Sequence, residues 1–133
     1  MKHIITIVFL VVGLFGSELN WSSDYKQALK SAKKEHKLVY VFITSDSCQW
    51  CRKFENKTLK DKKTLKRLYS EFEVVHLSRD RHTIPKKFKT APIPRHYFVD
   101  SNGKILYSSL GYRGRVCFDA FMDNAENKVR VTK

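Results

Sequence analysis

The sequence has few cysteines and few acidic residues, and both shortages limit what the protein can be. Three cysteines among 133 residues leave at least one unpaired within the chain. There are 13 acidic residues against 26 basic ones, which gives a formal net charge of +13. Such an excess attracts acidic partners, membrane surfaces or nucleic acid. The lysines are scattered over several segments, however, so a solvated basic surface is the simpler interpretation.

Long apolar segments are also missing, apart from one short run near the start of the chain. Residues 4–15 are apolar except for Thr6 and Gly13, and as a helix they would be about 18 Å long. That length is too short to span roughly 30 Å of hydrocarbon. A short basic start, this apolar run and the small residues Gly16 and Ser17 follow the order of a secretory signal.

We therefore expect residues 1–17 to be a signal peptide, cleaved after Gly16 or Ser17 or retained, and residues 18–133 to form a single domain. No cysteine lies near this site, which excludes a lipid-anchored cysteine. We find no internal repeat, no low-complexity segment and no second domain. The signal predicts a periplasmic protein, and export argues against a nucleic-acid partner.

The feature around which the chain is organised is the motif Cys48-Gln49-Trp50-Cys51. The wholly apolar run 38–43 precedes it, and a helix is predicted to follow it. At a helix N-terminus the unpaired N–H groups and the positive dipole end make a sulfur easier to ionise. Cys51, one turn further on, can reach Cys48 and close a disulfide. This arrangement predicts a redox-active dithiol.

Two simpler roles for the pair are weaker. A disulfide that closes so short a loop restricts the unfolded chain little, so a purely structural role explains little. A zinc site needs about four ligands, whereas Cys117 and the histidines are scattered and no second paired motif is present. We therefore expect no metal site. For Cys117 itself, a partly buried free thiol is a simpler interpretation than a third redox thiol.

Hydrophobic periodicity predicts an α/β protein. We expect helices over 24–36, from Cys48 onward, over 61–70 and around 118–125, and strands over 38–43, 72–77, 96–99 and 104–110. The long connection between the first two strands implies parallel pairing, and the turn at 100–103 makes a hairpin. The result is a small mixed sheet of four to five strands with helices on both faces.

Three local details are also predicted. Ser22 or Ser23 caps the first helix, with acidic Asp24 in its first turn. Tyr69 faces inward from the helix over 61–70. Residues 129–133 form a frayed tail.

These elements resemble the thioredoxin fold over about residues 21–125. The resemblance is carried by the strand 39–43, the Cys48–Cys51 motif, Pro94 before a strand, and the turn 100–103 before Gly111-Tyr112. Within that superfamily the chain is similar to small exported thiol:disulfide oxidoreductases, including periplasmic reductases of the DsbH type.

The resemblance implies roles for several residues. Cys48 would be the nucleophile and Cys51 the resolving thiol. Only about 5–6% of X–Pro bonds in folded proteins are cis, but the family has a cis-proline facing the cysteines, and Pro94 matches it. Ile93 and Pro94 would therefore pair with an extended substrate segment. Trp50 would contact substrate or, equally well, cap the edge of the sheet.

One position departs from the family. Many thioredoxins keep a buried carboxylate six residues before the first cysteine, and here that position is Phe42. Asp46 and Glu55 are the nearest acids in sequence, but neither is placed as a substitute, so water is left as the proton carrier. His96 could tune the thiolate, although a surface or partly buried histidine is the simpler interpretation.

The sequence thus predicts a periplasmic oxidoreductase that reduces protein disulfides, with no cofactor beyond the dithiol. Its partners would be disulfide-containing exported proteins and a membrane electron donor, and we expect a monomer. A disulfide oxidase or isomerase uses the same chemistry in another direction. A metal carrier using the pair Cys48 and Cys51, or a basic binding module with incidental cysteines, would belong to a different class.

Overall fold

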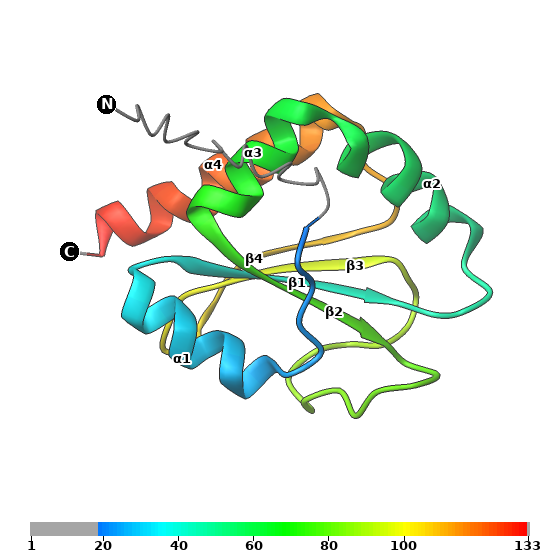
Figure 1. Cartoon of the computed structure of the whole chain (residues 1–133), viewed down its shortest axis with the longest axis horizontal. Coiled ribbons are helices and arrows are strands. Elements are labelled where there is room, and N and C mark those ends of the chain that lie inside the picture. Colours follow the sequence, from blue (N-terminus) through cyan, green and yellow to red (C-terminus); the bar gives the residue numbers. More distant parts are fainter. Residues whose placement is uncertain (1–18, 133) are drawn as a thin grey trace, which may run out of the picture.

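A computed structural model describes residues 19–132 of the chain. A four-stranded sheet of order β2-β1-β3-β4 forms its middle layer. In Figure 1, α1 lies on one side of this sheet, and α2, α3 and α4 lie on the other. The predicted mixed sheet with helices on both faces is therefore confirmed. The elements are α1 (Tyr25–Glu35), β1 (Leu38–Thr44), α2 (Gln49–Lys57), the short 3-10 helix η1 (Thr58–Lys60), α3 (Lys62–Glu71), β2 (Phe72–Ser78), β3 (Arg95–Val99), β4 (Ile105–Leu110) and α4 (Arg115–Val131).

Strand β1 is the centre of the sheet. It pairs in parallel with β2, where Phe42 lies opposite His76, and antiparallel with β3, where Phe42 lies opposite His96. All of its residues from Val39 to Thr44 are buried. An apolar strand with no polar alternation is typical of a position covered on both faces, so this prediction is also confirmed.

The two faces of β1 supply two separate cores, because successive side chains of a strand point to opposite sides. Tyr40 and Phe42 pack with α2, α3 and α4, whereas Val39, Val41 and Ile43 pack with α1. The predicted apolar face of the last helix belongs to the first of these cores. Its four residues are all buried: Phe118, Phe121, Met122 and Ala125.

The cap of α1 differs from the prediction. Asp24 is the N-cap, and its carboxylate accepts a hydrogen bond from the Gln27 backbone N–H at 3.0 Å. The backbone of Ser22 instead pairs with the outer edge of β2: its N–H donates to Val74 O at 3.0 Å, and its carbonyl accepts from His76 N at 2.9 Å. This pairing holds Ser22 in an extended conformation before the helix begins.

Two further helix predictions were wrong. Tyr69 is 67% exposed, because Leu68 occupies the buried position of that turn and the next residue points about 100° away. Helix α4 continues to Val131, beyond the predicted start of a frayed tail. Lys128 supports this last turn by donating a hydrogen bond from Nζ to Leu106 O at 2.6 Å.

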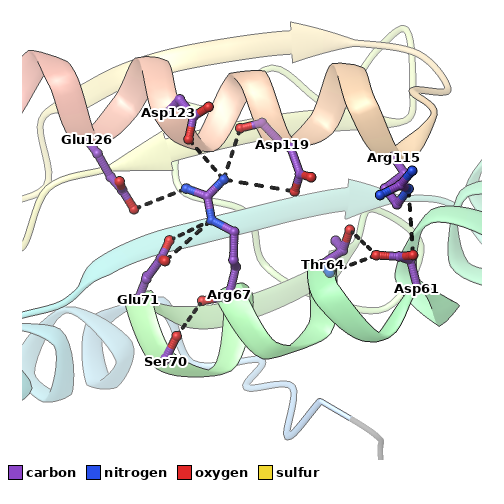
Figure 2. A network of polar contacts seen from close by, with 9 residues as sticks. All are labelled: Asp61, Thr64, Arg67, Ser70, Glu71, Arg115, Asp119, Asp123 and Glu126. Carbon is purple, nitrogen blue, oxygen red and sulfur yellow. Dashed lines mark hydrogen bonds and ion pairs between the residues drawn. The ribbon is translucent and has the colours of Figure 1, made fainter.

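Helices α3 and α4 are joined by one arginine. Figure 2 shows Arg67 of α3 reaching across to three carboxylates of α4. Its guanidinium lies 2.9 Å from Asp123 Oδ1 and 3.4 Å from Glu126 Oε1, and it also pairs with Glu71 of its own helix at 3.1 Å. The Arg67 side chain is only 19% exposed. We refer to this group, completed by Asp119, as the Arg67 cluster.

The predicted signal peptide, residues 1–17, lies outside the described residues. Among the helices of residues 19–132, none has the length and hydropathy needed to cross a membrane.

Candidate functional site

The two cysteines of the motif are joined at the start of α2. Cys48 is the N-cap of this helix, and its Sγ accepts a hydrogen bond from the Cys51 backbone N–H at 3.1 Å. The sulfurs form a disulfide, with the Cα atoms 5.3 Å apart. The free N–H groups and positive dipole end of α2 are therefore close to Cys48, which favours its thiolate once the disulfide is reduced.

The two cysteines differ in solvent exposure. Cys48 is 9% exposed and Cys51 only 2%. An incoming thiol or disulfide from another protein therefore meets Cys48 first, while Cys51 lies behind it.

Asp46 fixes the turn between β1 and Cys48 through several hydrogen bonds. Its carboxylate accepts hydrogen bonds from Ser78 Oγ and Arg81 Nε, each at 2.9 Å, and its backbone N–H donates to Asp80 Oδ2 at 2.7 Å. The Ser78 hydrogen bond, and then Arg81, lower the pKa of Asp46 against an opposing effect of partial burial. This carboxylate is ionised and engaged in tying the β1–α2 turn to the segment after β2.

Pro94 lies beside the same end of the sheet. Ile43 pairs with Arg95, so the residue before Arg95 lies next to the end of β1 that leads to Cys48. The Ile93–Pro94 peptide bond is cis, as is the Ala91–Pro92 bond. Pro94 is buried, its carbonyl accepts the Gly111 N–H at 2.8 Å, and Ile93 is half-buried.

Trp50 lies in the first turn of α2, and 49% of its surface is exposed. Its ring lies 6.3 Å from that of Tyr112. Lys53 Nζ lies 4.9 Å from both ring centroids, within reach of a cation–π interaction with each. Neither Lys53 nor Tyr112 was predicted to be a site residue. The i, i+3 spacing of Trp50 and Lys53 was the available signal for the lysine.

His96 is fully buried, contrary to the prediction of a surface or partly buried residue. Its Nε2 lies 2.9 Å from Gly111 O, and its Nδ1 lies 2.7 Å from the Tyr40 hydroxyl. Because a carbonyl only accepts, Nε2 carries the proton and Nδ1 accepts from Tyr40. Burial lowers the pKa of His96 to about 4. His96 is thus a neutral residue that ties β3 to β1 and to the loop after β4.

A cleft of about 360 Å³ opens beside the disulfide. Phe42 is fully buried and packs against Phe54, with ring centroids 5.2 Å apart, so no carboxylate reaches the sulfurs from that position. The cleft contains other polar groups. Its lining comprises Thr44, Ser45, Asp46, Cys48, Cys51, Arg52, Glu55, His76 and Arg81.

Two titratable groups of this cleft have shifted pKa values. Burial raises the pKa of Glu55, with the charge of Arg52 opposing it. Burial also lowers the pKa of His76, assisted by the charges of Arg81 and His82 and opposed by Asp46. No role was predicted for Glu55 or His76. The spacing of Cys51 and Glu55, and the pairing of β2 with β1, were the signals for them.

Cys117 is exposed and free rather than partly buried. It precedes Phe118, which takes the buried position at the start of α4, and it does not line the cleft. Within residues 19–132, no group of three or more histidine, cysteine or acidic side chains is placed to hold a metal ion.

The chain belongs to the thioredoxin-like domain family, whose model matches residues 25–126. Its fold and its Cys48–Cys51 pair are those of a thioredoxin-like thiol–disulfide oxidoreductase. A curated relative is the disulfide bond reductase DsbH of Chlamydia pneumoniae, which is 29% identical over 108 residues. That match covers 68% of this chain and 61% of the relative's length.

Solved structures share the fold. A DsbH oxidoreductase superimposes with a TM-score of 0.67 and 22% identity, over 82% of this chain and 85% of that one. A thioredoxin from Thermus thermophilus gives 0.61 and 22% over the same shares. The oxidised C-terminal domain of Neisseria meningitidis DsbD gives 0.57 and 18%, over 74% of this chain and 90% of that domain.

Proposed function

We propose that this protein is a periplasmic thiol–disulfide oxidoreductase that reduces disulfides of exported proteins. The observation that carries the proposal is the Cys48–Cys51 disulfide at the N-terminus of α2, with Cys48 as the more exposed sulfur. The similarity to a relative named as a disulfide bond reductase supports the direction. The signal-like segment 1–17 supports export.

The reaction proceeds by two exchanges. The Cys48 thiolate attacks one sulfur of a substrate disulfide, the substrate S–S bond breaks, and a mixed disulfide forms. Cys51 then attacks Cys48, and the second substrate sulfur leaves as a thiolate. The substrate gains two electrons, and the protein returns to the disulfide form. A membrane electron donor re-reduces it, because the compartment itself is oxidising.

Substrate is held beside Cys48 by groups on two segments. The Ile93–Pro94 backbone lies at the end of the sheet that leads to the cysteines, and it pairs with an extended stretch of the substrate. The exposed ring of Trp50, backed by Lys53 and Tyr112, adds an apolar surface from α2. The protein acts as a monomer and needs no cofactor beyond the two thiols.

The proposal is tested by reduction of insulin disulfides with dithiothreitol as the electron source. We expect the purified protein to accelerate the reaction and a Cys48→Ser variant to lose all of this acceleration, because the attacking sulfur is gone. The Cys51→Ser variant should instead accumulate a mixed disulfide with substrate, visible by mass spectrometry. Cys117→Ser is the matched control and should retain full activity.

Two results would count against the proposal. Activity that survives in Cys48→Ser would remove the motif from the chemistry. An inactive wild-type protein that retains stoichiometric copper or zinc through purification would favour a metal carrier.

A further inference from the structure

In the second exchange of the proposed reaction, the thiol proton of Cys51 needs an acceptor. Cys51 must lose its thiol proton before it attacks Cys48, yet it is only 2% exposed. Bulk water therefore has poor access to this proton. Phe42 occupies the position where many thioredoxins carry a carboxylate, and its side chain cannot accept a proton.

Glu55 is placed to take the proton. It lies four residues after Cys51 on α2, and side chains at this spacing are neighbours on one helix face, with Cβ atoms about 5–6 Å apart. Both residues line the same cleft. Burial raises the pKa of the Glu55 carboxyl, so its affinity for a proton is higher than that of an exposed glutamate.

His76 lines the same cleft from the sheet. It lies opposite Phe42 in the β1–β2 pairing, and its ring stacks on that of Phe42 at 5.3 Å between centroids. Its Nε2 lies 2.8 Å from Thr44 Oγ1, which fixes the plane of the ring. Burial lowers the pKa of His76 while it raises that of Glu55, and such convergence favours proton transfer between two groups.

We propose that Glu55 accepts the Cys51 proton and that His76 carries it from the cleft to solvent. This inference rests on the proposed function. In the mixed disulfide, the Cys51 proton moves to the Glu55 carboxylate. The Cys51 thiolate then forms a bond to Cys48 Sγ, the bond between Cys48 and the substrate breaks, and its electron pair leaves on the substrate sulfur. The proton passes from Glu55 to neutral His76 and on to water.

Other charges around the cleft set the conditions for this transfer. Arg52, Asp46 and Arg81 line it, while His82 acts on His76 from the segment after β2. Glu55 also lines a second hollow, which it shares with Lys60 and Trp21. Asp46 is engaged with Ser78 and Arg81 and does not compete as an acceptor.

The two exchanges can be followed separately with a chromogenic aromatic disulfide. Attack by Cys48 releases one coloured thiolate, and attack by Cys51 on the mixed disulfide releases a second. All proteins carry Cys117→Ser, because exposed Cys117 would also react. The first phase then serves as an internal control for folding and for Cys48 reactivity.

We expect Glu55→Gln to slow the second phase by at least about tenfold at neutral pH and to leave the first phase unchanged. The direction of the change in the second-phase rate distinguishes a proton acceptor from a nearby negative charge. If Glu55 acted only as a nearby negative charge, its removal would make the Cys51 thiolate easier to form and would speed the second phase. Added acetate should restore the rate of Glu55→Gln, and Glu55→Asp should retain part of it.

His76→Gln should also slow the second phase, with recovery on addition of imidazole. Glu73→Gln is the matched control, because Glu73 lies on the same strand but pairs with Lys37 outside the cleft. A second phase that is unchanged or faster in Glu55→Gln would overturn the proposal. A wild-type protein without a first phase would overturn the proposed function as well, so the two failures are distinguishable.

Discussion

Residue 96 of β3 is a histidine at a fully buried position, and most fully buried residues are apolar. His96 is enclosed by the rings of Phe42, Phe54 and Phe118, and its two nitrogens are both hydrogen-bonded. The Nε2 bond holds Gly111, whose own N–H binds the Pro94 carbonyl. His96 therefore positions the loop next to Pro94, and it does so in the neutral form.

This burial makes the stability of the protein depend on pH. The pKa of His96 is about 4 in the folded protein, against about 6.5 in the unfolded chain. The unfolded state therefore binds the proton more tightly, and stability falls as the pH drops from about 6.5 to about 4, by roughly 3 kcal/mol. Urea unfolding at several pH values should show this loss in the wild type. In His96→Leu the contribution of this residue should be missing, so stability should fall by correspondingly less over the same window. Identical pH dependence in both proteins would contradict this account.

The burial of His96 and the exposure of Cys117 were not predictable from their local sequence. Both follow from contacts with distant residues: Tyr40 and Gly111 for the histidine, and the packing of Phe118 for the cysteine. By contrast, the Cys48–Cys51 pair was predictable locally, because the motif stands at the exit of an apolar strand and before a helix. The role of Pro94 was implied by the resemblance to the thioredoxin fold.

At the scale of elements, the Arg67 cluster is the main polar link between α3 and α4 (Figure 2). It gathers four carboxylates around one partly buried guanidinium. Burial, and then the hydrogen bond and charge of Glu71, raise the pKa of Glu126 to about 6. These crowded carboxylates stay close together only while the positive charge of Arg67 offsets their mutual repulsion.

Replacing Arg67 with methionine should destabilise the protein by about 2 kcal/mol at pH 7.5, because the carboxylates are left to repel one another. The loss should be smaller at pH 5. The native state binds a proton at Glu126 more readily than the unfolded chain does, so protonation below about pH 6 relieves the repulsion. Thermal and urea unfolding at the two pH values measure this difference.

Arg115→Met is the control for that experiment. Arg115 pairs with Asp61 at 3.6 Å, but its side chain is 48% exposed, so its loss should cost less than about 0.5 kcal/mol. An equal effect of the two substitutions, or an Arg67→Met effect independent of pH, would contradict the role given to the cluster.

Most helices and strands were predicted from hydrophobic periodicity, and the errors lie at the ends of these elements. The buried strand β1 and the inward face of α4 were predicted because long apolar patterns average over many residues. Tyr69 was misplaced because it neighbours Leu68, and a helix turns by about 100° between adjacent residues. The cap of α1 was misassigned because the pairing of Ser22 with β2 depends on the tertiary fold.

For the whole molecule, the elements converge on one end of the sheet. The end of β1, the start of α2 and the segment before β3 all meet there, and together they place the disulfide, Pro94 and the cleft (Figure 1). The resemblance to the thioredoxin fold, in which a proline faces the cysteines, implied this meeting point. The lining of the cleft was not predictable, because Glu55 and His76 come together only through the packing of α2 on β2 and β1.

The reduction potential of the Cys48–Cys51 pair tests the direction of electron flow most directly. The purified protein is equilibrated in glutathione buffers, and the reduced fraction is measured by thiol alkylation, with Cys117→Ser as the control. A reductase should have a reduction potential of roughly −270 mV, in the range of thioredoxin. A potential above about −150 mV would place the protein with the strong oxidants and contradict the account.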